Sequence, residues 1–196
     1  MAHGEFNAML QLLAALLLSG RTGVLLLMLA LAAAIDSRSH RIPNWLVLSG
    51  AAYALVYNTV LPPWHNGTVL FPLAGLGLGL LLFLPLYLMR AMGAGDVKLM
   101  AMVGAFLGPN EIWRAALLVW ASGGLLALAF VVLNGTALRM VNNLTALFRL
   151  GALDVVNLTA PSLHISKEFS AGRLPYGTAI ALGTASYLVL HELAYV

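Results

Sequence analysis

Residues 68–89 read TVLFPLAGLGLGLLLFLPLYLM and contain no charged side chain. A run of about 20 apolar residues is long enough to cross the hydrocarbon core of a bilayer as a helix. The rest of the chain is similar, since 61% of its 196 residues are hydrophobic, 9% are charged and the mean hydropathy is +0.93. Soluble domains carry about 25% charged residues, so the composition excludes a soluble globule, a disordered chain and a coiled coil. We therefore expect an all-α polytopic membrane protein.

Polar or Gly/Pro-rich breaks divide the chain into apolar segments. We expect a single membrane-embedded domain over residues 1–196 with six transmembrane helices, at about 21–35, 43–61, 68–89, 94–107, 112–133 and 175–195. Residues 6–18 are interpreted as an interfacial or re-entrant helix, with a signal peptide as the alternative. Residues 136–150 separate apolar from polar side chains on two helical faces, which predicts a helix lying on the membrane surface. With the polar loop after it, this helix forms a predicted cytoplasmic segment, 136–172.

Two of the predicted spans have unusual features. The third carries Gly75, Gly77 and Gly79, and such small residues let a neighbouring helix approach closely. The fourth, at 94–107, is only about 21 Å long at 1.5 Å per residue, against a hydrocarbon core of about 30 Å. We expect it either to end below the membrane surface or to lie where the bilayer is thin.

The basic residues predict the orientation, because cytoplasmic loops of membrane proteins are enriched in Lys and Arg. With six spans and the N-terminus outside, eight of the ten basic residues fall on the cytoplasmic side, and only Arg21 and Arg114 fall on the other. We therefore expect a multi-pass protein whose basic loops face the cytoplasm, with the lipid bilayer as one partner.

Two of the seven acidic residues stand out by position. Five lie in polar stretches, turns or span ends, where solvent accounts for them, but Asp36 ends the first span and Asp96 begins the fourth. The topology brings Asp36 and Asp96 to the same side at similar depth. A charged group within the membrane is costly, so an acid at this depth is a functional candidate. Two carboxyl groups at one site can share a proton, one acting as base and the other as acid.

The helix ends suggest which carboxyl is which. Asp96 lies at a predicted helix N-terminus, where the helix dipole favours the anion, whereas Asp36 lies at a helix C-terminus. We therefore expect Asp96 to be the resting carboxylate and Asp36 the resting acid. A boundary acid paired with a neighbouring Lys or Arg is the alternative explanation for each of them.

Three stretches resemble the type IV prepilin peptidases, which are membrane aspartyl proteases of the GxGD type. Residues 36–44 (DSRSHRIPN) are similar to the first-aspartate motif, an Asp followed by a basic loop and Ile-Pro-Asn. Residues 93–98 (GAGDVK) resemble the longer GxGD motif, and residues 175–181 (PYGTAIA) resemble the start of the last helix in the family. The three occur in the order that the family shows.

The resemblance implies a site and a substrate. It makes Asp36 and Asp96 the catalytic pair, with water as the nucleophile. The other motif positions are expected to support the pair, without an assigned chemical step: Pro43, Gly93, Gly95, Lys98, Pro175 and Gly177. The implied substrate is a prepilin whose short basic leader is removed at the cytoplasmic face, just before an apolar helix. No metal or other cofactor is expected, because the histidines lack ligand spacing and there is no cysteine, and no nucleic-acid partner is indicated.

The match is closer to the short TadV/CpaA-like peptidases of Flp/Tad-type pili than to the longer bifunctional members. Those members carry an N-terminal cytoplasmic domain, often with paired cysteines, that is associated with N-methylation of the new pilin terminus, so methyl transfer is not expected here. Two alternatives remain. One is another GxGD protease, such as an archaeal preflagellin peptidase or a protease of the presenilin or signal-peptide-peptidase kind. The other is a small transporter or scaffold in which the two carboxyl groups act as gates.

Overall fold

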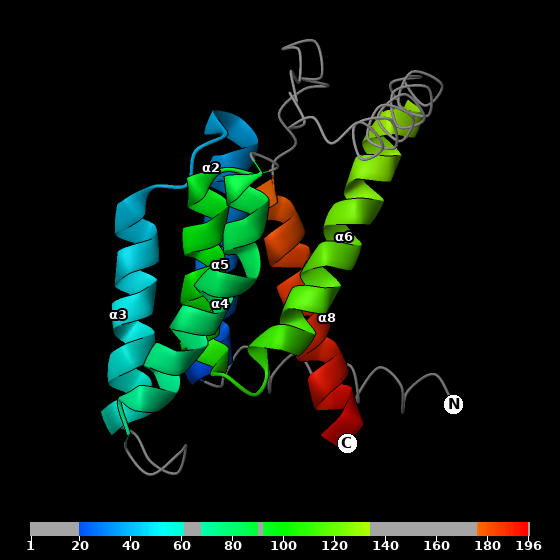
Figure 1. The fold of residues 1–196 in the computed structure, drawn as a ribbon. Coiled ribbons are helices and arrows are strands. Elements are labelled where there is room, and N and C mark those ends of the chain that lie inside the picture. Colours follow the sequence, from blue (N-terminus) through cyan, green and yellow to red (C-terminus); the bar gives the residue numbers. More distant parts are fainter. Residues whose placement is uncertain (1–19, 61–67, 90–91, 134–175, 196) are drawn as a thin grey trace, which may run out of the picture. The chain divides into compact units, whose positions relative to one another are not determined.

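The computed structural model describes residues 20–60, 68–89, 92–133 and 176–195. Within these residues every element of secondary structure is a helix, which confirms the all-α prediction. In chain order they are α2 (Gly20–Ser39), α3 (Asn44–Val60), α4 (Leu70–Leu88), α5 (Ala94–Leu107), α6 (Ile112–Leu133) and α8 (Tyr176–Tyr195), as Figure 1 shows. The predicted interfacial helix at 6–18, the segment 136–172 and Pro175 lie outside the described residues.

One helix extends further than the sequence indicated. The first apolar segment was expected to end near residue 35, but α2 continues to Ser39. The hydroxyl groups of Ser37 and Ser39 donate hydrogen bonds to the carbonyls of Ala34 and Ile35, at 3.0 and 2.9 Å. These bonds satisfy backbone acceptors in a polar last turn, so Asp36 lies one turn inside the helix rather than at its last residue.

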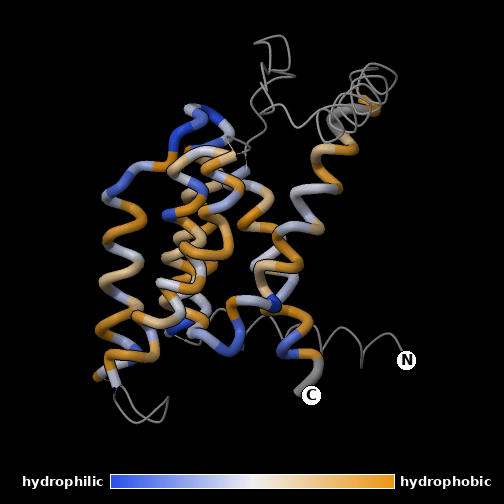
Figure 2. The backbone as a smooth tube through the Cα atoms, in the orientation of Figure 1, coloured by the Kyte–Doolittle hydropathy of each residue, from blue (hydrophilic) through white to orange (hydrophobic). Residues whose placement is uncertain are grey.

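Three described helices are long and apolar enough to cross a membrane, namely α2, α4 and the Ile112–Ala129 part of α6. Hydrophobic residues run along these helices, while hydrophilic residues gather at the end of α2 and in the connection to α3 (Figure 2). The number of crossings and their orientation stay predictions.

The chain divides into two compact units. One contains Met1–Gly123 together with Pro175–Val196, and the other contains Gly124–Leu174. In the second unit the structure describes only the end of α6, through Leu133. The candidate site lies entirely within the first unit.

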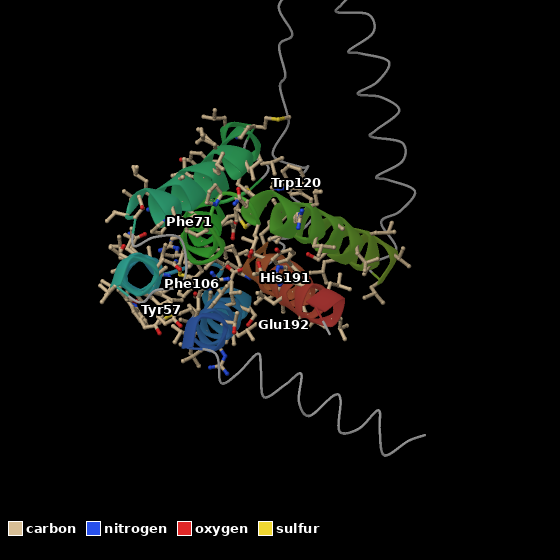
Figure 3. The ribbon with its side chains drawn as sticks, turned by 90° about the horizontal axis from the view of Figure 1, so that it is seen from below. Tyr57, Phe71, Phe106, Trp120, His191 and Glu192 are labelled. Carbon is tan, nitrogen blue, oxygen red and sulfur yellow. The ribbon has the colours of Figure 1, made fainter. Side chains whose placement is uncertain are left out.

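Helix α5 is the central element of the first unit. Eleven of its fourteen residues are buried, and it contacts α2, α3, α4 and α8. Seen from below, α5 lies among these helices, with Phe106 near its end (Figure 3). A helix that is surrounded by protein does not have to match the thickness of the bilayer, which accounts for the short length of α5.

Glycines allow α4 to pack directly on α5. A methyl group at Gly75 would overlap with the backbone of Gly104, and one at Gly79 would overlap with the carbonyl of Met100. Nothing lies within 4 Å of a methyl group at Gly77. The predicted close approach is therefore found at Gly75 and Gly79 but is wrong for Gly77, because Gly77 occupies a different face of α4.

Candidate active site

Asp36 lies near the end of α2, against the start of α8. Its side chain is buried, with the residue 5% exposed. The backbone N–H of Gly177, the second residue of α8, donates a hydrogen bond of 2.8 Å to its Oδ2 atom. Because α2 packs along α8, two residues that are far apart in the sequence are held in direct contact.

Asp96 occupies the first turn of α5, where the sequence predicted it. It is also buried, at 8% exposure. Gly93 precedes the helix in an extended conformation, and its N–H donates a hydrogen bond of 3.0 Å to the Oδ2 atom of Asp96. The Asp96 N–H returns a bond of 3.2 Å to the Gly93 carbonyl. This reciprocal pair fixes the side chain at the helix N-terminus, as a capping-box acid does.

The fold brings Asp36 and Asp96 together from helices sixty positions apart. The two carboxyl groups lie close enough to interact electrostatically. They are the only buried charged residues among those that the structure describes. Burying a charged group costs several kcal/mol unless it is paired or hydrogen-bonded, and neither carboxyl group has a Lys or Arg bound to it within the described residues. Within the described residues, the pairing of each acid with a base that the alternative requires is therefore not seen.

The surroundings of the two carboxyl groups differ less than the sequence suggested. Asp36 does lie at the C-terminal end of its own helix, but it accepts its hydrogen bond from the N-terminus of α8. Asp96 accepts its bond at the N-terminus of α5. A helix N-terminus therefore faces each carboxyl group and donates an N–H to it. The helix ends alone do not distinguish the two carboxyl groups, and Asp36 as the resting acid stays a prediction.

Gly177 allows α8 to approach Asp36. A methyl group added at Gly177 would lie 2.9 Å from Oδ2 and 3.0 Å from the Cβ atom of Asp36. Either Asp36 or the helix start would have to shift to accommodate it. The absence of a side chain at Gly177 is therefore what permits this close approach.

The connection between α2 and α3 is folded back onto α5. His40, exposed and with φ of 50°, ends α2 by donating its N–H to the Asp36 carbonyl at 2.8 Å. Pro43 precedes the first residue of α3, and its carbonyl accepts a bond from the N–H of Leu46 at 3.2 Å.

Ile42, in the same connection, is buried, and its Cβ atom lies 3.2 Å from the position of a methyl group on Gly95. Gly95 therefore gives Ile42 room against the turn that carries Asp96.

A second contact joins the same two segments. The Nζ atom of Lys98 donates a hydrogen bond of 3.0 Å to the Oδ1 atom of Asn44. The resemblance singled out Lys98 but not Asn44. Asn44 could be read from the sequence as the last residue of Ile-Pro-Asn, but nothing in the sequence predicts its hydrogen bond to Lys98, which lies 54 positions later.

The described residues contain no group of three or more His, Asp or Glu side chains that could hold a metal ion. The other described acids lie away from the pair. Glu111 lies just before α6, with its Oε2 atom 3.9 Å from Arg21 Nη2 and its Oε1 atom 3.8 Å from His191 Nε2. Glu192 lies near the far end of α8 (Figure 3).

The fold and the site define a helical protein that has three helices apolar and long enough to cross a membrane and two carboxyl groups buried among its helices. The family model of the type IV leader peptidase family matches residues 23–136, more than half of the chain, and the chain therefore belongs to that family. The match contains both aspartates and ends before Gly177. Neither the curated proteins nor the solved structures contain a match.

Proposed function

We propose that this chain is an aspartic endopeptidase that removes the short basic leader from type IV prepilins, in particular those of the Flp/Tad class, at the cytoplasmic face of the inner membrane. Membership of the type IV leader peptidase family supports a protease that acts on prepilin leaders. The observation that carries the assignment of the chemistry is the burial of Asp36 and Asp96 in mutual electrostatic range, each with one backbone N–H donor.

The proposed reaction uses a water molecule held between the two carboxyl groups. One carboxylate removes a proton from the water, whose oxygen then forms a bond to the scissile carbonyl carbon. The other carboxyl group, protonated, donates its proton to the carbonyl oxygen. When the C–N bond breaks, the carboxyl group that took the water proton donates it to the leaving nitrogen. The other carboxylate takes back a hydroxyl proton of the intermediate as the C=O bond re-forms, and the products are a leader carboxylic acid and a pilin amine. The pair then holds one proton again, as at the start.

The Gly177 and Gly93 N–H groups serve this reaction by orientation. Each binds the Oδ2 atom of one aspartate and so fixes the orientation of that carboxyl group. Positioning of this kind supplies a large part of the rate enhancement in enzymes.

The test is cleavage of a panel of purified prepilins by the purified protein in detergent, with products identified by mass spectrometry. The panel contains a Flp-type prepilin, a longer type IV prepilin and an archaeal preflagellin. We expect the Flp-type substrate to lose its leader, and its new N-terminus to remain unmethylated when a methyl donor is present. Preference for the preflagellin would contradict the Flp/Tad assignment. Absence of cleavage with all three would contradict the protease itself and favour a transporter or scaffold.

A further inference from the structure

Lys98 is a motif residue for which the proposed reaction has no chemical step. It follows Asp96 by two positions on α5, its side chain is exposed, and its Nζ atom binds Asn44 Oδ1 at 3.0 Å. Asn44 is the first residue of α3 and follows Asp36 by eight positions. The contact therefore connects the segment that follows one aspartate to the helix that carries the other.

The contact between Lys98 and Asn44 helps to fix the α2–α3 connection on α5. Helix α2, which carries Asp36, contacts α5 less extensively than α3 and α4 do. The position of Asp36 relative to Asp96 therefore depends on α8, whose Gly177 N–H binds Asp36, and on how the short connection after α2 is held. Two contacts hold the connection against α5, namely Ile42 on Gly95 and Asn44 on Lys98. The second is a charge-assisted hydrogen bond, which is stronger than a hydrogen bond between two neutral groups.

We propose that Lys98 is a positioning residue, which binds Asn44, holds the α2–α3 connection against α5 and so keeps Asp36 in register with Asp96. This inference rests on the proposed function for its kinetic consequences. It assigns Lys98 no contact with the substrate.

The kinetic test compares variants on a Flp-type prepilin. Lys98→Met keeps the aliphatic stem and removes the donor, and Asn44→Leu removes the acceptor. We expect each to lower kcat about tenfold without changing KM, because a hydrogen bond to a charged group is lost. The double variant should be no worse than either single one, since both remove the same contact. Asn44→Asp, which keeps an acceptor, should retain activity.

The matched control is Arg41→Met, which removes a cation from the same connection. Arg41 is exposed, like Lys98, so a general effect of charge on the substrate would appear in both variants. We expect Arg41→Met to keep the wild-type kcat. A loss equal to that of Lys98→Met would overturn the proposal, as would a rise in KM at unchanged kcat, since Lys98 would then bind substrate.

A second readout needs no substrate. The chain contains no cysteine, so Ile42→Cys with Gly95→Cys creates a single pair, whose Cβ atoms start 3.2 Å apart, close to the ~3.5–4.5 Å of a disulfide. Oxidation should cross-link this pair rapidly, and addition of Lys98→Met should slow cross-linking severalfold, because the connection leaves α5 more often. An unchanged rate would overturn the proposal.

The two readouts separate the inference from the function. If the wild type cleaves no prepilin while Lys98→Met still slows cross-linking, the proposed function fails and the positioning role stands. If the wild type cleaves prepilin and Lys98→Met cleaves it equally fast, the positioning role fails and the function stands.

Discussion

At the scale of single residues, the site consists of two buried carboxyl groups and the backbone that serves them. Asp36 and Asp96 are 5% and 8% exposed, and each accepts one hydrogen bond from a glycine N–H at a helix N-terminus. Glycine suits both positions because the backbone must come close to a carboxylate. Neither glycine provides chemistry, but each fixes one oxygen of an aspartate.

The first prediction concerns Gly177→Ala. The added methyl group would lie 2.9 Å from the Asp36 Oδ2 atom, so either the carboxyl group or the start of α8 must shift, and the contact between them changes. A misplacement of about 1 Å can cost about 100-fold in rate, and we expect kcat on prepilin to fall between 10- and 100-fold.

The control for Gly177→Ala is Gly123→Ala, whose methyl group would make an ordinary contact of 3.7 Å with Ala179. It should leave kcat unchanged, and the melting temperature in detergent should show that both variants are folded. A wild-type kcat for Gly177→Ala would show that the contact with Asp36 is not needed for catalysis.

At the scale of elements, α5 determines the arrangement of the others. It is buried along most of its length and carries Asp96 in its first turn. The helices that pack on α5 are therefore positioned relative to this carboxyl group. The close approach of α4 depends on Gly75 facing Gly104, and such backbone contact between helices is a common packing mode in membranes.

The second prediction compares two glycines of the same helix. Gly75→Ala should destabilise the protein by roughly 1–3 kcal/mol, as overpacking does, because its methyl group would overlap with the α5 backbone. Gly77→Ala meets nothing within 4 Å and should be neutral or stabilise by about 0.5–1 kcal/mol, since alanine favours the helix. Thermal unfolding in detergent measures both. Equal effects of the two substitutions would contradict the packing of α4 on α5.

Local sequence was sufficient for the helices but not for their contacts. The apolar segments predicted where helices lie, because their composition alone requires burial or lipid. The end of α2 was misplaced because the hydroxyl bonds of Ser37 and Ser39 extend it. The contacts of Asp36 with Gly177 and of Lys98 with Asn44 join positions 141 and 54 residues apart. Hydrophobic periodicity reports which residues are buried, but not which pairs of helices meet.

At the scale of the whole molecule, the site residues are at one end of their helices and the Arg21–Glu111 pair is at the other. Asp36 is near the end of α2, whereas Arg21 is near its start. Asp96 lies in the first turn of α5, and Glu111 follows the end of that helix. This separation is what the proposed orientation requires, with the carboxyl pair towards the cytoplasm.

The third prediction tests that orientation by labelling introduced cysteines in a chain that has none of its own. Ser39→Cys lies at the exposed end of α2, and Asn110→Cys lies in the exposed turn between α5 and α6. A membrane-impermeant maleimide added to intact cells should label Asn110→Cys, and should label Ser39→Cys only after the inner membrane is opened. The reverse pattern would place the site outside the cell.

The most direct test of the account is leader removal from a Flp-type prepilin by the wild type, Asp36→Asn and Asp96→Asn, each purified in detergent and shown to be folded. Asn keeps the size of the side chain but cannot act as the base or acid that the reaction needs. Glu192→Gln serves as the control, because it removes a carboxyl group at the far end of α8. We predict that the wild type and Glu192→Gln release the leader and that neither Asn variant does. Cleavage at the wild-type rate by either Asn variant would contradict an aspartate pair as the site of catalysis.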